Sequence, residues 1–266
     1  MDKAITHDPL VLVARRAAAA GAEVLAGRDE SQFNISDKSA VGDWVTDFDR
    51  ASEEAIRATI TTSRPSDELT GEEYPSAKPL NPSGVRWSID PLDGTINFVR
   101  NIAYYCSSVG ACQLEEDGTE TWVAAAIVAP ALQVEYFAGK GLGAWKQDLR
   151  TGKLTKLTGP VDSPAKILGT GFGYDAQRRQ FQARVLEEML ADYVNVRRIG
   201  SAALDLCLVA QGSLDAYAEY GTQEYDWAAG ALIAEEAGCA VGRPATYPGW
   251  QYAGLVDPAK LTEPTS

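Results

Sequence analysis

Hydrophobic residues recur at helical spacing near the start of the chain. Leu10, Val13 and the alanines that follow them share one helix face, and Asp8 before Pro9 is a typical helix start. We therefore expect a first helix that ends near Gly27. The same spacing predicts further helices over about residues 49–60, 176–191, 201–210 and 226–237.

Runs rich in β-branched and aromatic residues predict strands between these helices. The expected strands are residues 85–89, 104–114, 122–129, 134–137, 144–147, 153–157, 167–170 and 214–220. They cluster in mid-chain as a meander and then alternate with helices, which predicts a layered α/β (α+β) fold rather than a single doubly wound sheet. A change of composition near residues 158–160 (TGP) predicts two subdomains, about 1–158 and 159–266, within one domain.

The composition is that of a globular protein with a strong acidic excess. Hydrophobic residues make up 45% of the chain, enough for a sizeable core, and 37 acidic against 24 basic residues give a net charge of −13. Because such a field repels phosphate backbones and anionic lipids, we expect no nucleic-acid partner and no membrane partner. The four cysteines show no CxxC spacing, and no long apolar segment is present. We expect a soluble cytoplasmic protein with free thiols.

The chain has a single histidine, His7, close to the N-terminus. Mechanisms that need imidazole as a base or a metal ligand therefore have almost nothing to use. This argues against serine-hydrolase triads, cysteine–histidine dyads and histidine-based zinc sites, and the phosphate-binding GxxxxGK[ST] loop is also missing from the sequence. Carboxylates must carry the chemistry of any active site.

An acidic turn follows the strand predicted at 85–89. Its sequence, DPLDGT at residues 90–95, combines Asp90 and Asp93 with a proline that favours extended backbone before it and with Gly94, which permits a tight turn. Two converging carboxylates repel each other unless a cation lies between them, and oxygen ligands favour Mg²⁺. A short helix starting at Gly94 or Thr95 would also direct free amides toward a phosphate. Alternatively, the acidic side chains only cap that helix.

Two other acidic segments strengthen this hypothesis. Glu72 lies in the run LTGEE at residues 69–73, and Asp226 opens the helix predicted at 226–237. Each alone is typical of a solvated turn or a helix N-cap, and Asp49 is most simply the N-cap of the second helix.

These segments together resemble the inositol monophosphatase family. The resemblance lies in the order and spacing of residues 43–46 (DWVT) with Asp49, 71–73 (GEE), 90–98 and 226–238, and it spans roughly residues 8–256. It implies an αβαβα sandwich, a cluster of two or three Mg²⁺ ions, inhibition by lithium and a homodimer. Residues 197–205 (RRIGSAALD) are similar to the inositol monophosphatase branch of that superfamily.

The resemblance also implies roles for individual residues. The metal ligands would be Glu72, Asp90, the backbone carbonyl of Leu92, Asp93 and Asp226. The catalytic residues around an attacking water would be Glu72, Thr95, Asp49 and Thr46. The substrate would contact Asp93, Gly94, Thr95, Gly200, Ser201, Ala202, Glu219 and Asp226. Tyr225 stands where the family often has tryptophan, and Cys239 where glycine is common, which affects the rim of the site but removes no ligand.

The implied reaction is Mg²⁺-dependent hydrolysis of a small phosphate monoester, inositol monophosphate to inositol and phosphate. The catalytic segments do not separate this substrate from histidinol phosphate, 3′-phosphoadenosine 5′-phosphate or fructose bisphosphate. Because Glu219 would suit a cationic substrate, the expected partner is a phosphorylated polyol or amino alcohol. A non-catalytic, metal-binding regulatory protein is the minor alternative. Arg197 and Arg198 would serve a dimer contact, a phosphate contact or a solvated strand end.

Overall fold

The fold was analysed in a computed structural model that describes residues 4–29, 33–37, 44–115, 117–162 and 164–263. Its helices are α1 (Pro9–Ala26), α2 (Asp47–Ser63), α3 (Thr95–Val99), α4 (Ala176–Met189), α5 (Ala202–Gln211), α6 (Glu224–Glu236) and the 3₁₀ turn η2 (Pro258–Lys260). None of the helices in the described part of the chain is long and apolar enough to cross a membrane.

The strands form two large sheets and one short pair. The first sheet, in spatial order, is β3 (Glu68–Gly71), β4 (Val85–Asp93), β5 (Cys106–Leu114), β6 (Glu120–Ala129), β7 (Val134–Gly139), β8 (Gly143–Asp148) and β9 (Leu154–Lys156). The second is β11 (Asn195–Arg197), β10 (Ile167–Gly169), β12 (Ala216–Tyr220), β14 (Trp250–Gly254) and β13 (Val241–Gly242). The short pair is β1 (Ser36–Asp37) with β2 (Trp44–Val45).

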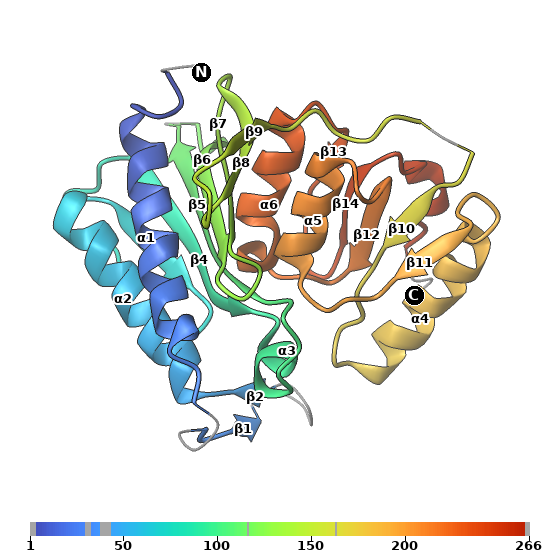
Figure 1. The fold of residues 1–266 in the computed structure, drawn as a ribbon, viewed down its shortest axis with the longest axis horizontal. Helices are drawn as coiled ribbons and strands as arrows, with labels where there is room; N and C mark the ends of the chain where they lie inside the picture. The colour runs from blue at the N-terminus through green and yellow to red at the C-terminus, as the bar shows by residue number, and fades with distance from the viewer. Residues whose placement is uncertain (1–3, 30–32, 38–43, 116, 163, 264–266) are drawn as a thin grey trace.

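The elements stack in five alternating layers (Figure 1). Helices α1 and α2 cover one face of the first sheet, α5 and α6 lie between the two sheets, and α4 covers the outer face of the second sheet. Strand β4 runs parallel to β3, and from β4 to β9 the first sheet is an antiparallel meander. The predicted layered α/β fold and the mid-chain meander are confirmed.

The first helix shows how local sequence determines the packing. Asp8 Oδ1 accepts hydrogen bonds from the amides of Leu10 (3.0 Å) and Val11 (2.9 Å), and Pro9 follows as the first helical residue. A Cβ added at Gly21 would lie 2.5 Å from Ser107 Oγ on β5. Glycine is therefore needed where this helix approaches the sheet.

Two expectations about local structure were wrong, and several elements were missed. Thr46, not Asp49, is the N-cap of α2, because its hydroxyl accepts from the Phe48 amide while Asp49 occupies the third helical position. Strand β4 continues to Asp93 instead of ending at residue 89. The sequence-based interpretation also lacked β3, β11 and β14, which are short or edge-lying runs. The chain passes from the first sheet to the second between Lys156 and Ile167, but the division into subdomains stays a prediction.

Candidate active site

A cleft of about 660 Å³ lies between the ends of the two sheets. Helices α4, α5 and α6 begin at this cleft, so their positive dipole ends favour an anionic ligand. The predicted site residues that line it are Glu72, Asp90, Leu92, Asp93, Gly94, Thr95, Gly200, Ser201, Ala202, Glu219 and Asp226. Residues from four separate parts of the sequence are thus brought together.

A bulge in β4 presents the two aspartates of the acidic turn. Asp90 pairs with Ser108 on β5 and Asp93 pairs with Cys106, so Pro91 and Leu92 together face a single residue. Proline suits a bulge because it has no amide hydrogen for the ladder. The Leu92 amide donates to Asp90 Oδ1 over 3.1 Å. The bulge therefore directs both carboxylates, three residues apart, toward the same cleft.

The turn after the bulge requires glycine. Gly94 has φ of 98° and precedes α3, which begins at Thr95, one of the two starts considered for a short helix there. A Cβ at this position would lie 3.0 Å from the Tyr104 carbonyl oxygen. A left-handed backbone and a close contact both exclude larger residues, so Gly94 determines where the acidic turn ends.

Thr95 connects the cleft to a buried carboxylate behind it. The Thr95 hydroxyl lies 3.1 Å from Asp49 Oδ1 and 3.2 Å from the Leu92 carbonyl oxygen. Thr46 donates its amide (2.7 Å) and its hydroxyl (2.6 Å) to Asp49 Oδ2. Asp49 and Thr46 are fully buried and reach the cleft through Thr95. This arrangement holds Asp49 in position to accept a hydrogen bond from Thr95.

Asp93 links the acidic turn to the start of α5. Its Oδ2 accepts hydrogen bonds from the Ser201 hydroxyl and the Ala203 amide, each 2.7 Å long. Burial nevertheless raises the pKa of Asp93 to about 6, and these hydrogen bonds oppose the shift. Ser201, which was predicted to contact substrate, thus uses its hydroxyl to hold a carboxylate; its substrate contact stays a prediction.

Asp226 lies in the first turn of α6 and faces other acids. The Gln223 amide donates to Asp226 Oδ2 over 2.6 Å. Burial raises the pKa of the Asp226 carboxyl well above its usual range, and the like charges of Asp93 and Glu72 raise it further. These acids are near enough to repel one another, so a cation in the cleft would stabilise their ionised forms.

The chemistry of the donors suits magnesium. Glu72, Asp90, Asp93 and Asp226, hereafter the carboxylate wall, supply only oxygen atoms, which hard divalent cations prefer. Within the described ranges, no group of three Asp, Glu, His or Cys side chains is already arranged to hold a metal ion. Three of the four carboxylates are instead oriented by the hydrogen bonds described above, and ion binding would draw them together.

A second set of polar groups lines the same cleft. Glu219, at the end of β12, accepts from the Tyr217 hydroxyl over 2.8 Å. Asp205 on α5 accepts from the Tyr104 hydroxyl over 2.7 Å. Burial raises the pKa of Glu219 to about 7 and that of Asp205 well above its usual range, and the positive charge of Arg198 opposes both shifts. We call Arg198, Asp205 and Glu219, with Gly200 and Ala202, the β12 wall.

Comparisons with known proteins agree with this site. The model of the inositol monophosphatase family matches residues 6–254. A protein named Inositol-1-monophosphatase SuhB, from Mycobacterium tuberculosis, is 43% identical over 242 residues, which cover 86% of this chain and 82% of that protein. The chain belongs to the inositol monophosphatase family.

Other relatives and a solved structure extend the match. A solved structure of Mycobacterium tuberculosis SuhB superposes with a TM-score of 0.75 at 37% identity, covering 92% of this chain and 91% of that one. A Pasteurella multocida protein named Nus factor SuhB is 36% identical over 236 residues, covering 87% of this chain and 84% of that protein. The predicted family membership is confirmed.

Sequence reasoning missed several residues of this inositol monophosphatase-like cleft. Arg198 was left without an assignment, yet it lines the cleft beside the acids of the β12 wall. Tyr174, Arg178 and Tyr247 also line it, and Arg178 donates to the Tyr247 hydroxyl over 3.0 Å. No motif marks these rim residues. Tyr225, one of the departures from the family pattern, lies in the cleft, whereas Asp43 lies outside the described residues.

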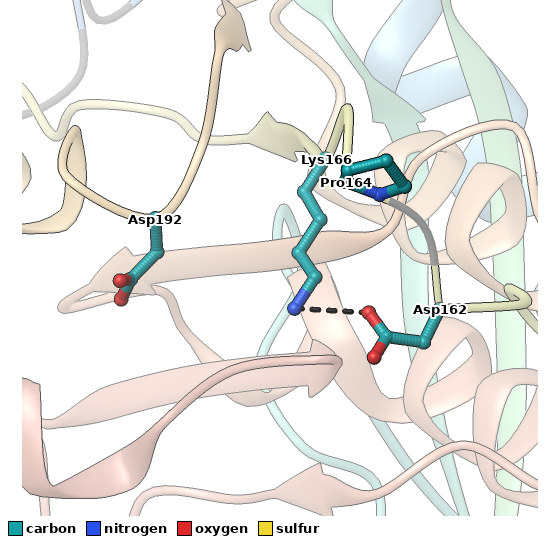
Figure 2. A pocket seen from close by; sticks show the side chains of 4 residues that line it. All are labelled: Asp162, Pro164, Lys166 and Asp192. Atoms are coloured by element: carbon teal, nitrogen blue, oxygen red, sulfur yellow. Dashed lines mark ion pairs between the residues drawn. The ribbon is translucent and has the colours of Figure 1, made fainter.

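A second depression in the family fold carries none of the predicted site residues. It has a volume of about 350 Å³ and is lined by Asp162, Pro164, Lys166 and Asp192 (Figure 2). Lys166 points toward Asp162, and their ion pair spans 3.0 Å, while Asp192 pairs with Lys260. Each of its charged side chains is already in an ion pair, so we place the active site in the larger cleft.

All four cysteines are free. Cys106, Cys112 and Cys207 are buried, and Cys239 is half-buried. Burial raises the pKa of each of these thiols, so they stay protonated. This agrees with the expectation of free thiols, and the cysteines take no part in the proposed chemistry.

Proposed function

We propose that the chain hydrolyses inositol monophosphate to inositol and phosphate in a Mg²⁺-dependent reaction. The observation that carries this proposal is the meeting, in one cleft, of the carboxylate wall and Thr95, which is backed by Asp49. The enzyme class, a phosphoric monoester hydrolase of the inositol monophosphatase family, agrees with the family match and with the relative from Mycobacterium tuberculosis.

The carboxylate wall would hold the metal ions. Glu72, Asp90, Asp93, Asp226 and the Leu92 carbonyl are the ligands we propose, for two or three ions. Bound Mg²⁺ supplies positive charge to the phosphoryl oxygens and polarises the attacking water. The aspartates stay ionised in that state because the cations offset the mutual repulsion and the burial that otherwise raise their pKa values.

Thr95 and Asp49 would accept the proton of the attacking water. When the Thr95 hydroxyl donates to Asp49 Oδ1, its oxygen lone pairs remain to accept a hydrogen bond from a water in the cleft. The proton can then pass from the water to Thr95 and from Thr95 to Asp49. Thr46 holds the other oxygen of Asp49, and Glu72, which lines the same cleft, would orient the water.

The β12 wall would receive the alcohol part of the substrate. Glu219 and Asp205 are hydrogen-bond acceptors for hydroxyl groups, and Gly200 and Ala202 leave room beside them. The same two acids favour a second candidate, histidinol phosphate, because its leaving group is cationic. The positive charge of Arg198 on this wall opposes a cation, so the polyol stays the first choice.

The proposal extends to assembly, partners and location. The family resemblance predicts a homodimer, the acidic charge of −13 predicts no nucleic-acid partner, and the cysteines without CxxC spacing predict a cytoplasmic location. A relative carries the name Nus factor, so binding to nucleic acid is worth a direct test alongside the enzyme assay.

A phosphate-release panel tests the proposed function. Inositol 1-phosphate, histidinol phosphate, 3′-phosphoadenosine 5′-phosphate, fructose 1,6-bisphosphate and glycerol 2-phosphate are compared at matched concentrations, with Mg²⁺, with EDTA and with added Li⁺. We expect the highest kcat/KM for inositol 1-phosphate, no release with EDTA, and inhibition by Li⁺.

Each other outcome of the panel has a clear meaning. A dominant kcat/KM for histidinol phosphate would replace the substrate but keep the chemistry. Release that EDTA does not affect would contradict the role of the metal. No release from any substrate, together with intact Mg²⁺ binding, would favour the non-catalytic, metal-binding alternative.

A further inference from the structure

Arg86 is a mostly buried arginine outside the cleft, on the strand that carries Asp90 and Asp93. It lies on β4 between Val85 and Trp87, and 11% of its side chain is exposed. Its guanidinium donates Nη1 to Glu224 Oε1 and Nη2 to Glu224 Oε2, the latter over 3.0 Å. Such a two-point contact fixes orientation as well as distance.

Two partners of Arg86 lie close in sequence to predicted metal ligands. Glu224 is the first residue of α6 and lies two residues before Asp226. Thr70, whose hydroxyl accepts from Arg86 Nη1 over 3.3 Å, lies on β3 two residues before Glu72. Arg86 itself lies on the strand that carries Asp90 and Asp93. One guanidinium therefore joins all three elements that supply the carboxylate wall.

Aromatic packing restrains the guanidinium further. Arg86 Cζ lies 5.7 Å from the centre of the Trp122 ring, and Trp122 packs edge-on against Trp227 of α6, with 5.7 Å between ring centres. Glu120 adds a second ion pair over 2.9 Å at the exposed edge. These contacts hold the start of α6 against β4 and restrict movement of the helix along the strand.

We propose that Arg86 is a positioning residue for the metal site, acting through its paired contact with Glu224 and through Thr70. This inference rests on the proposed function, because it assumes that the carboxylate wall binds Mg²⁺. The side chains of Glu72, Asp90 and Asp226 must converge on common ions, and each is attached to a different element. Arg86 keeps these elements in register, so its loss weakens ion binding without removing a ligand.

The chain contains a matched control for this test. Arg15 on α1 donates Nε and Nη2 to Glu135 of β7, over 2.7 and 2.8 Å, and lies 3.9 Å from the centre of the Phe137 ring. This contact is also bidentate, lies against an aromatic ring and is mostly buried. It joins α1 to β7, however, and neither residue lines the cleft.

The test measures Mg²⁺ binding directly, without substrate. EDTA-treated wild type, Arg86→Met, Glu224→Gln, the double variant and Arg15→Met are titrated with Mg²⁺ by calorimetry, and thermal unfolding is followed with and without the ion. We expect a Kd about tenfold weaker in Arg86→Met and in Glu224→Gln. The double variant should be no weaker than the worse single variant, because both remove one contact. Arg15→Met should lose thermal stability and keep the wild-type Kd.

A turnover assay adds a second readout. At saturating Mg²⁺, kcat of Glu224→Gln should return to within about twofold of wild type, because every ligand is still present. If Arg86→Met does not fold, the Kd of Glu224→Gln still tests the inference.

Two results would overturn the inference. One is an unchanged Kd in Arg86→Met or Glu224→Gln, and the other is an equal loss of affinity in Arg15→Met, which would mark a general effect of stability. If the wild type itself bound no Mg²⁺, the proposed function would fail. If the wild type binds Mg²⁺ and hydrolyses phosphate esters while the variants bind equally well, only the role of Arg86 fails.

Discussion

The two walls of the cleft differ in how they are built. The carboxylate wall comes from a bulged strand, the end of β3 and a helix start, and its aspartates are held by short hydrogen bonds. The β12 wall combines single residues from the segment before α5, from α5 itself and from β12. In the proposed reaction the first wall would hold the cations that meet a phosphate, and the second would offer hydrogen-bonding groups to the alcohol part of the ester.

This difference separates chemistry from substrate choice. Changes on the carboxylate wall should lower turnover of every phosphate ester to a similar degree, because each ester has the same phosphoryl group. Changes on the β12 wall should affect binding of one ester more than another. The variants below compare inositol 1-phosphate with 4-nitrophenyl phosphate, whose leaving group has no hydroxyls.

The largest effect is expected at Asp93. Asp93→Asn removes a charge from the carboxylate wall, while its amide oxygen can still accept from Ser201 and Ala203, so the fold should persist. We expect kcat for both esters to fall to below about a hundredth of wild type. The exposed Asp117, changed to Asn, is the control. If Asp93→Asn kept more than about a tenth of kcat at saturating Mg²⁺, a loss of only about 1.4 kcal/mol, the assignment would be wrong.

A loss of similar kind is expected at Asp49. Asp49→Asn removes the proposed proton acceptor behind Thr95. Because general-base catalysis contributes about 100-fold or more to the rate, kcat should fall by at least that factor. Asp47→Asn changes a neighbouring, exposed acid in the same helix turn and should leave kcat intact. Circular dichroism checks that α2 still forms. Equal activity of the two variants would contradict the proton path through Thr95.

A smaller, selective effect is expected on the β12 wall. Glu219→Gln weakens acceptance of hydrogen bonds from substrate hydroxyls, so KM for inositol 1-phosphate should rise about tenfold while KM for 4-nitrophenyl phosphate stays within about twofold. Steady-state kinetics of both esters provides the measurement. A parallel change for the two esters would remove the distinction between the walls.

The smallest effect is a dependence of KM on pH. Because burial raises the pKa of Glu219 to about 7, its carboxylate loses charge as the pH falls through that value. KM for inositol 1-phosphate should therefore rise severalfold more between pH 8 and pH 6 in the wild type than in Glu219→Gln, because the substrate's own phosphate, with a second pKa of about 6, titrates alike with both proteins. Identical profiles for the two proteins would show that Glu219 does not bind the substrate in its ionised form.

The sequence predicted one wall better than the other, for a physical reason. Residues 90–95 combine a proline, a glycine and two acids that a single bulged turn explains, and Glu72 and Asp226 lie in segments with the family's spacing. The β12 wall has no such local signal. Asp205 ends the run at residues 197–205 but had no assigned role, and Arg198 had three open interpretations, because the roles of both depend on neighbours distant in sequence.

Connections across long sequence separations explain the other omissions. Arg86 appears in the sequence as one residue of a strand, and its partner Glu224 is 138 residues away. Strand β14 is a five-residue run placed between β12 and β13 by tertiary contacts. The N-cap of α2 was assigned to Asp49 because an aspartate at a helix start is a common cap, whereas Thr46 and Asp49 share the task in a capping box.

The central claim is that carboxylates from separate elements form one metal site. Calorimetric titration of EDTA-treated wild type, Glu72→Gln and Asp226→Asn with Mg²⁺ tests it most directly, because it needs no substrate. We expect saturable binding by the wild type and a loss of affinity of at least about tenfold in each variant, although the two residues lie on different elements. Wild-type protein that binds no Mg²⁺, or variants that bind it as tightly as the wild type, would contradict the account.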